Sequence, residues 1–527
     1  MKKISISIIL TVVILLCASL TSCENNDPCE SMGGVTTLLP SVTTTSDKVD
    51  TELLSYLQYE VNEDGKTCTL TQISHEKYKT DIVIPEYIDG YKVTAIGDKM
   101  FQRYEGVRKI TLPDGITEIG RSAFASCYNL EIINIPDGVT TIGEWAFTGC
   151  SKIKSFNIPK NVTSIGVCAF ANCNKLEEIS VDDENPVYKS VDGNLYTKDG
   201  KIFLQYATGK TAKEFVLADG VTTICDRAFD NTRSIKSITL PSTLTDIGRE
   251  AFFACMSLEN IVVPNGVKVI EYGTFGHCTS LKSVTLPDSI TEISYYAFQN
   301  CGSLFSITIP PLVTEIKQNT FEGCERLESV TMSDNVTVIK KSAFWMCKNL
   351  KNVRLSEGLK CIESRAFYGA EGLTEISIPD SVESIEKEAF YMTNAIVYKG
   401  NLGYVDKWVV EGGDTTRAIV FDSETVGIAA CAMENINISV TELIIPEGVK
   451  YIDSEAFKNS RWIKTISLPK SLEYIGEKAF ENCEVLVNLT YAGSVDEWGN
   501  VVLDGEEIFL HTNLGGVVCA DGRVRIK

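Results

Sequence analysis

Apolar residues recur along most of this chain with a period of 23 residues. A phenylalanine marks each repeat, and within each of three blocks consecutive marker phenylalanines lie 23 positions apart. One such unit cannot bury its own apolar side chains, so stacked copies must share a continuous core, as in a solenoid. The marker residues are Phe101, Phe124, Phe147, Phe170, Phe229, Phe252, Phe275, Phe298, Phe321, Phe344, Phe367, Phe390, Phe457 and Phe480.

The unit around Phe147 shows which elements each repeat predicts. The repeat reads V-x-x-I-G-x-x-A-F-x-x-C-x-x-L-x-x-I-x-I-P. Its I-x-I-P end alternates with period two and is rich in β-branched residues, which predicts a short strand closed by proline. The V-x-x-I piece also suits an extended strand, whereas the three- and four-residue spacings of G-x-x-A-F-x-x-C predict one helical turn. Successive units are then expected to pair their strands in parallel.

This repeat resembles the BspA-like class of leucine-rich repeats. Segments such as KSITLPSTLTDIGREAFFACMSL (residues 236–258) fit that class closely, and the resemblance covers roughly residues 59–527. It implies an α/β leucine-rich-repeat solenoid with parallel β-strands, short helical turns, one β-hairpin or meander insertion and terminal caps. It further implies a surface or secreted binding protein, since some members of the class are adhesins for host matrix proteins. The resemblance names no ligand.

The first residues predict export and lipid attachment. Lys2 and Lys3 precede an apolar run that ends in Leu20-Thr21-Ser22-Cys23, which resembles the lipobox of bacterial lipoproteins. The resemblance implies cleavage before Cys23, acylation of Cys23 and stable anchoring through its lipid chains. An uncleaved signal anchor is the alternative. The acidic stretch after Cys23 weakly resembles an export signal for surface-exposed lipoproteins, so we expect the outer membrane and the cell surface, with the leaflet left open.

The period divides the chain into regions. Residues 1–22 are the predicted lipoprotein signal peptide, 23–55 a flexible tether, 56–95 an N-terminal cap with the first repeat, 96–490 the solenoid, and 491–527 a C-terminal cap. Insertions near 182–217 and 394–413 interrupt the solenoid. Between the second insertion and Phe457 lies a degenerate repeat in which Met433 replaces the marker phenylalanine.

The two insertions carry the candidate ligand-contacting residues. In the first, Asp192-Gly193 and Asp199-Gly200 separate short strand-like runs, which predicts a β-meander. Such a meander either braces the edge of the solenoid or contacts a ligand. The aromatic cluster of the second insertion is either a local mini-core or a binding platform. The candidates are Tyr188, Tyr196, Tyr206, Tyr398, Tyr404 and Trp408.

Half of the 18 cysteines share one repeat position. Nine lie three residues after a marker phenylalanine, at Cys127, Cys150, Cys173, Cys255, Cys278, Cys301, Cys324, Cys347 and Cys483. Identical positions on adjacent repeats give parallel Cβ directions, which disfavours disulfides and predicts a ladder of buried free thiols. One or two disulfides remain open among Cys29, Cys68, Cys168, Cys225, Cys361, Cys431 and Cys519.

The amino-acid composition argues against several classes of function. Asp and Glu outnumber Lys and Arg by 70 to 49, and the net charge of −21 argues against a nucleic-acid partner. The three histidines are far apart, no catalytic motif is present, and we expect no enzymatic activity, cofactor or metal. The acids at 182–184 suit solvated loop positions, with calcium coordination as the alternative. The outward strand positions form a small polar ribbon, which favours solubility over ice binding.

Two hypotheses for function follow. The first is a non-enzymatic, adhesin-like surface protein that engages a protein ligand, such as a host matrix or cell-surface protein, through its extended repeat surface. The alternative is a glycan-binding, nutrient-capture surface lipoprotein. The alternative requires exposed aromatic side chains in the insertions.

Overall fold

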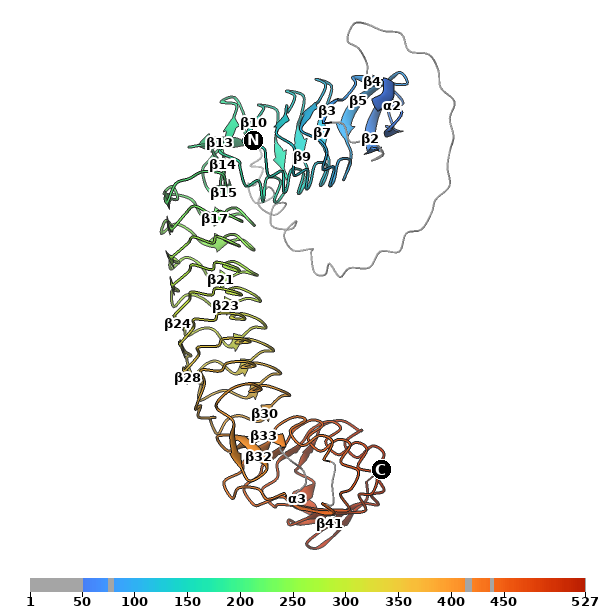
Figure 1. The fold of residues 1–527 in the computed structure, drawn as a ribbon, viewed down its shortest axis with the longest axis vertical. Helices are drawn as coiled ribbons and strands as arrows, with labels where there is room; N and C mark the ends of the chain where they lie inside the picture. Colours follow the sequence, from blue (N-terminus) through green and yellow to red (C-terminus); the bar gives the residue numbers. More distant parts are fainter. Residues whose placement is uncertain (1–50, 74–79, 413–418, 437–439, 527) are drawn as a thin grey trace, which may run out of the picture. The chain divides into compact units, whose positions relative to one another are not determined.

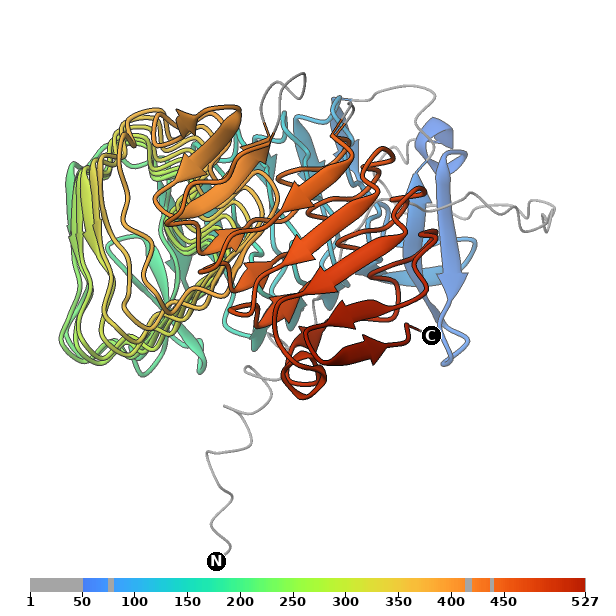
Figure 2. The ribbon, with the colours of Figure 1, turned by 90° about the horizontal axis from the view of Figure 1, so that it is seen from below.

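The computed structural model describes residues 51–73, 80–412, 419–436 and 440–526. The predicted signal peptide, most of the predicted tether and the predicted lipidation site Cys23 lie outside the described residues. Within them the chain forms a β-solenoid of about 18 turns with repeats of about 23 residues (Figures 1 and 2). The helices of the described part are α2 (Thr51–Leu54) and α3 (Val495–Trp498).

Most repeats contribute two short strands, and most of these strands pair in parallel with their counterparts one repeat later. β24 (Ser306–Thr308) pairs with β26 (Ser329–Thr331), with Ser306 opposite Ser329. β25 (Glu315–Ile316) pairs with β27 (Val338–Ile339) in the same register of 23 residues. The predicted parallel pairing is confirmed, and the V-x-x-I piece is a strand.

The strands formed by the I-x-I-P ends make up the first ladder, whose outward residues are small and polar in most repeats. Its other members are β3 (Asp81–Val83), β6 (Lys109–Thr111), β8 (Ile132–Ile133), β10 (Ser155–Ile158), β12 (Glu178–Val181), β16 (Glu214–Val216), β18 (Ser237–Thr239), β20 (Asn260–Val262), β22 (Ser283–Thr285), β28 (Asn352–Arg354), β35 (Glu442–Ile444), β37 (Thr465–Leu468), β39 (Asn488–Tyr491) and β41 (Val517–Cys519).

The V-x-x-I pieces form the second ladder. Its other members are β5 (Tyr91–Ile96), β7 (Glu118–Ile119), β9 (Thr141–Ile142), β11 (Ser164–Ile165), β17 (Thr223–Ile224), β19 (Asp246–Ile247), β21 (Val269–Ile270), β23 (Glu292–Ile293), β29 (Cys361–Ile362), β30 (Ser384–Ile385), β34 (Gly427–Ile428), β36 (Tyr451–Ile452), β38 (Tyr474–Ile475) and β40 (Val502–Leu503).

The segment around each marker residue is a run of turns, and the predicted helical turn is not confirmed. Two residues before and two after Phe298, the backbone is left-handed, at Tyr296 (φ 59°) and Asn300 (φ 56°). Left-handed residues at this spacing interrupt the helical i→i+4 bonding pattern. Instead, the amide of Cys301 donates to the carbonyl of Phe298 within the turn, and the amide of Phe298 donates to Thr320 on the next repeat.

The marker phenylalanines form a stacked column inside the solenoid. Within each block their ring centroids lie 5.1 to 5.9 Å apart and the ring planes are nearly parallel. Phe509 extends the last block by stacking on Phe480, with 5.6 Å between the ring centroids. It follows Phe480 by 29 residues and therefore does not fit the 23-residue period. The period therefore marks most, but not all, rungs of the aromatic column.

Both insertions are three-stranded antiparallel meanders. The first contains β13 (Tyr188–Val191), β14 (Asn194–Thr197) and β15 (Ile202–Gln205), as the sequence predicts. The second contains β31 (Val397–Lys399), β32 (Leu402–Val405) and β33 (Trp408–Gly412), whereas we expected one meander insertion. In each meander the last strand pairs in parallel with the next second-ladder strand, β15 with β17 and β33 with β34. Each meander thus starts a new stretch of the second ladder.

The first meander also divides the hydrophobic core. On adjacent positions of β14, Leu195 packs in the N-terminal core cluster and Tyr196 in the C-terminal one. Because both faces of β14 are buried, this meander is an internal wedge between two runs of repeats. Such a wedge is the bracing role that the sequence left open.

Short antiparallel elements lie at both ends of the described chain. β1 (Leu57–Val61) pairs with β2 (Thr67–Ile73), which pairs in parallel with β5, and β4 (Tyr87–Ile88) pairs with β5. At the other end, β41 pairs with β42 (Gly522–Val524). Ser494 and Glu497 form a capping box on α3, whose Trp498 is buried against Tyr491.

Candidate binding surface

The three tyrosines predicted as ligand contacts in the first insertion are buried, so their expected exposure is wrong. The hydroxyl of Tyr188 accepts a hydrogen bond from the amide of Ile165 at 3.0 Å. Tyr196 packs edge-on against Phe203. Tyr206 stacks on Phe229 at 5.4 Å and takes the place of a marker residue on that side of the column. These side chains hold the wedge in the solenoid.

In the second insertion the predicted aromatic residues differ in solvent exposure. Tyr404 and Trp408 are buried, so for them too the expected exposure is wrong. The hydroxyl of Tyr404 accepts a hydrogen bond from the amide of Asp422, and the indole of Trp408 stacks on Tyr451. Tyr398 is exposed as expected, and its contact with a ligand stays a prediction. The cluster is mainly a local core, with one side chain left outside.

Tyr398 is one of four exposed apolar residues in one short segment, which we call the 391–398 patch. It comprises Tyr391, Met392, Val397 and Tyr398, whose side chains are 46%, 49%, 55% and 56% exposed. The hydroxyl of Tyr398 donates to Glu411 at 2.8 Å. Partial burial, this hydrogen bond to Glu411, the charge of Glu411 and the nearby Tyr391 raise the pKa of Tyr398 to about 12. Clustered exposed apolar side chains of this kind mark interaction sites.

An aromatic row leads into the patch along three consecutive repeats. Trp345 stacks on Tyr368 at 6.3 Å, and Tyr368 lies 5.4 Å from Tyr391. All three occupy the position directly after a marker phenylalanine. The sequence therefore contained the signal, an aromatic residue at one repeat position in three successive units. The insertions carry more aromatic residues, and the sequence prediction rested on those.

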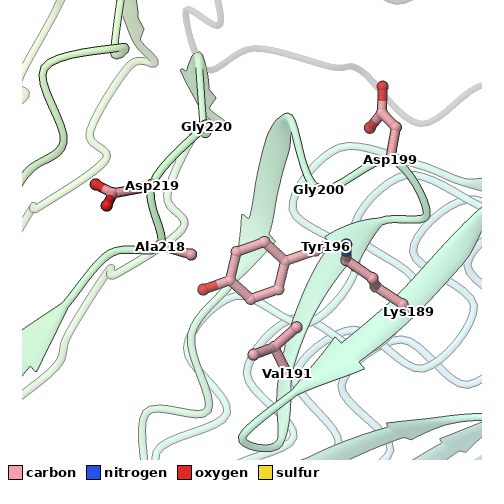
Figure 3. A pocket seen from close by; sticks show the side chains of 8 residues that line it. All are labelled: Lys189, Val191, Tyr196, Asp199, Gly200, Ala218, Asp219 and Gly220. Atoms are coloured by element: carbon pink, nitrogen blue, oxygen red, sulfur yellow. The ribbon is translucent and has the colours of Figure 1, made fainter.

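Two pockets among the described residues have mixed polar and apolar linings. One of about 140 Å³ lies where Tyr196 meets the loop of Ala218, Asp219 and Gly220 (Figure 3). Figure 3 shows the Tyr196 ring between that loop and the strand carrying Lys189 and Val191. A second, of about 470 Å³, lies around Asp453. Neither has the apolar lining typical of small-molecule sites, so the exposed surface is the better candidate.

The nine repeat-position cysteines are buried and free, which confirms the predicted thiol ladder. Each thiol donates a hydrogen bond to the carbonyl of the marker phenylalanine on the preceding repeat, at 3.0 to 3.3 Å. The disulfides left open are not formed among the described cysteines: Cys68, Cys168, Cys225, Cys361, Cys431 and Cys519 are all present as thiols. Cys29 lies outside the described residues.

The acids beside the first insertion serve local structure. Glu184 pairs with Lys160 at 2.9 Å, and Asp182 accepts a hydrogen bond from the amide of Glu184. In the described ranges no group of three or more His, Cys, Asp or Glu side chains is arranged to hold a metal ion. None of the helices in this part of the chain has the length and apolar character needed to cross a membrane.

Comparison with protein families gives a specific match. The BspA type leucine-rich repeat region matches residues 71–191, 205–328, 314–411 and 393–509, with six copies. The chain belongs to the BspA-type leucine-rich repeat family. Members of this family are bacterial surface proteins, and leucine-rich repeat scaffolds typically bind partners and are not enzymes. No curated protein sequence matches the chain.

Several solved structures of bacterial repeat proteins are similar to this BspA-type protein. A leucine-rich repeat protein from Eubacterium ventriosum is 23% identical, covers 68% of this chain and 97% of its own, and has a TM-score of 0.48. One from Bacteroides ovatus is 25% identical over 87% and 98%, with a TM-score of 0.43. A leucine rich cell surface protein from Faecalibacterium prausnitzii is 24% identical over 60% and 95%, with a TM-score of 0.34.

Proposed function

We propose that this chain is a non-enzymatic, lipid-anchored protein of the bacterial outer surface that binds a protein ligand through the 391–398 patch and the neighbouring repeats. The observation that carries the proposal is the exposure of Tyr391, Met392, Val397 and Tyr398 together on a solenoid that buries its marker aromatics. The lipobox-like sequence ending at Cys23 supports the anchor.

The chemistry of the patch favours a protein over a glycan. Sugars stack on the flat face of an aromatic ring, but the ring of Tyr368 lies between Trp345 at 6.3 Å and Tyr391 at 5.4 Å, which partly cover it. Met392 and Val397 offer aliphatic contact, and methionine adapts to irregular protein surfaces. The outward strand residues beside this region, such as Ser329 and Thr331, are too small to stack on sugars. An adhesin-like role, with a host matrix or cell-surface protein as ligand, fits this surface.

Binding is tested with the full mature chain on immobilised fibronectin, fibrinogen and collagen, with a glycan array in parallel. We expect retention on at least one matrix protein, weakened about tenfold or more by Tyr391→Ser combined with Tyr398→Ser, because buried aromatic anchors dominate interface energies. Tyr128→Ser is the matched control, since Tyr128 is 47% exposed on a distant repeat. Retention on glycans alone, or on no probe, contradicts the proposal, as does equal binding by the double variant.

The anchor is tested separately in cells. Metabolic labelling with an alkyne-bearing palmitate is expected to mark the wild-type chain and not the Cys23→Ser variant. Protease shaving of intact cells is expected to remove the wild-type chain while a periplasmic control protein survives. An unlabelled wild-type chain contradicts lipid attachment, and a protected one contradicts surface exposure.

A further inference from the structure

The turn that carries Phe170 meets the turn that carries Phe229 at a seam, where the chain skips 59 residues between markers. We use "first seam" for the contact between residues 168–172 and 226–231. Within an uninterrupted run of repeats the turns are joined by backbone: Phe147 donates its amide to the carbonyl of Ala169, and Phe229 donates to Ala251, both at 2.8 Å. At the seam, the equivalent carbonyl of Ala228 accepts from the amide of Tyr206 instead.

Side chains therefore join the two turns. The amide group of Asn172 donates to Oδ2 of Asp230 at 2.9 Å, and Asn231 donates to Asn172 at 3.2 Å. The thiol of Cys168 points to the carbonyl of Asp226 at 3.8 Å. Of these contacts, the one between Asn172 and Asp230 is the shortest and involves a carboxyl group that is 1% exposed. The protonation of Asp230 thus bears directly on the contact across the seam.

Asp230 and Glu250 share one cationic partner, the guanidinium of Arg227. The guanidinium of Arg227 contacts Asp230 at 3.2 Å with one nitrogen and Glu250 with another, and it lies over the ring of Trp145 at 5.2 Å. With both carboxyls ionised, this largely buried group carries one uncompensated negative charge, which is costly away from water. With a proton on Asp230, Arg227 and Glu250 form a balanced pair.

The surroundings place the proton on Asp230 near neutral pH. Burial raises the pKa of Asp230 to about 7. The charge of Arg227 and the hydrogen bonds from Arg227 and Asn172 oppose this shift, and Glu250 adds to it. The other charged and titratable groups packed at the seam are Asp226 and Arg249 on the C-terminal side, Cys255 on the next repeat, and Cys168 across the seam. Burial also raises the pKa of Asp226 and of the Cys168 thiol, so Cys168 is uncharged in this range.

We propose that the first seam is a pH-sensitive joint of the solenoid, closed while Asp230 holds its proton and loosened when the proton leaves. The extra charge of the ionised cluster is stabilised by water, and water reaches Asp230 when residues 168–172 separate from 226–231. No backbone ladder bond of the turns crosses at Ala228 to resist this separation, because Tyr206 occupies its carbonyl. The joint needs no ligand and is independent of the proposed binding function.

The sign and size of the effect follow from linkage. The pKa of Asp230 is about 7 when the seam is closed and near the ordinary aspartate value when it is open, so protons favour the closed form. Raising the pH from about 6 to about 8 is then expected to increase the open fraction about tenfold.

Hydrogen exchange with mass spectrometry on the full mature chain tests the joint. After correction for the intrinsic pH dependence of exchange, peptides covering 164–176 and 222–234 are expected to lose about tenfold in protection between about pH 6 and about pH 8. In Asp230→Asn this difference disappears, because asparagine cannot ionise. Asp288→Asn, which removes an exposed aspartate, keeps the wild-type behaviour.

A second variant and a second measurement keep the proposal testable if Asp230→Asn does not fold. In Glu250→Gln, Arg227 serves a single carboxyl, so the pH difference is expected to shrink. Alkylation of Cys168 at about pH 8 is expected to be faster in the wild type than in either variant. The charges of Asp230 and Glu250 raise the pKa of the Cys168 thiol, so thiol ionisation alone would make the variants react faster. Equal protection at both pH values in the wild type overturns the joint, as does a wild-type pH difference that persists in both variants.

Discussion

The thiol of Cys301 donates a hydrogen bond to the carbonyl oxygen of Phe275 on the preceding repeat, 3.1 Å away. The same contact recurs at every one of the nine repeat-position cysteines and ties the cysteine row to the phenylalanine column. Each thiol thereby satisfies a backbone carbonyl that the turn would otherwise leave with fewer partners. The cysteines are structural hydrogen-bond donors of small volume.

This contact predicts which substitutions the position accepts. Cys301→Ser is expected to lower the free energy of unfolding by about 1 kcal/mol or less, because Ser460 occupies the same position and its hydroxyl donates to Met433. Cys301→Leu is expected to cost about 1 to 3 kcal/mol, because the extra volume has no space between repeats. Urea unfolding followed by circular dichroism measures both, and a leucine variant as stable as the serine variant contradicts the packing.

The ladder thiols are expected to be inert in the folded chain. They are fully buried, and burial raises the pKa of Cys127 and of Cys173 to about 12. At about pH 8 roughly one thiol in ten thousand would then be ionised, and the thiolate is the reactive form. Brief alkylation with iodoacetamide, followed by peptide mass spectrometry, should modify the half-buried Cys225, Cys361 and Cys431 before the ladder cysteines, which react only after denaturation. Rapid modification of ladder cysteines in the native chain would falsify this prediction.

The phenylalanine column predicts a sharp contrast between two neighbouring residues. Phe298→Ala removes a ring packed between Phe275 and Phe321 and is expected to cost about 3 to 5 kcal/mol. Phe305→Ala, seven residues later, removes a side chain that is 55% exposed and should change stability by about 0.5 kcal/mol or less. Thermal unfolding of the two variants measures this contrast. Similar losses of stability in both would show that the phenylalanine column is not the core.

Close approach of the repeats predicts an intolerant glycine. A Cβ atom at Gly143 would lie 2.5 Å from the backbone of Gly120 on the preceding repeat, so Gly143→Ala forces the repeats apart and should lower the melting temperature. Gly302 is the matched control, because a Cβ atom there meets nothing within 4 Å. Gly302→Ala is expected to be neutral or to stabilise by about 0.4 to 1 kcal/mol, since alanine restricts the unfolded chain. Equal tolerance at both positions would contradict the close packing.

Asp453 predicts a pH dependence at the second insertion. Its carboxyl is buried and accepts a hydrogen bond from the amide of Ile385 at 3.0 Å, and burial raises its pKa to about 6. Because the folded pKa exceeds the unfolded value, the contribution of this group to stability is complete below about pH 4 and is lost as the pH rises through 6. The loss amounts to about 3 kcal/mol at most.

In Asp453→Asn this part of the pH profile should flatten, while Asp288→Asn, which changes an exposed aspartate, keeps it. Melting temperatures between about pH 4 and about pH 7 provide the measurement. A profile of Asp453→Asn that parallels the wild type across this window would show that Asp453 does not titrate there.

The repeat itself was predictable because its physical requirements are local and periodic. Each unit needs apolar side chains at the same places, so the 23-residue step predicts the strand register, as in the pairing of Ser306 with Ser329. The local prediction that the structure does not confirm is the helical turn. Three- and four-residue spacing also suits a chain of turns, and the left-handed backbone at residues such as Tyr296 has no sequence signature, since many residue types occur there.

The sequence by itself determined the parallel solenoid, the positions of its interruptions and the thiol ladder, because identical units must stack in register to bury their apolar faces. Only the tertiary structure decided which aromatic residues of the insertions face solvent. Tyr206 is buried because it lies 23 residues before Phe229 and donates its amide to Ala228, as marker phenylalanines such as Phe147 donate to the next repeat, whereas Tyr398 lies on β31, outside the mini-core. The exposure of Tyr398 depends on how the second meander packs against the repeats, which neither segment shows alone.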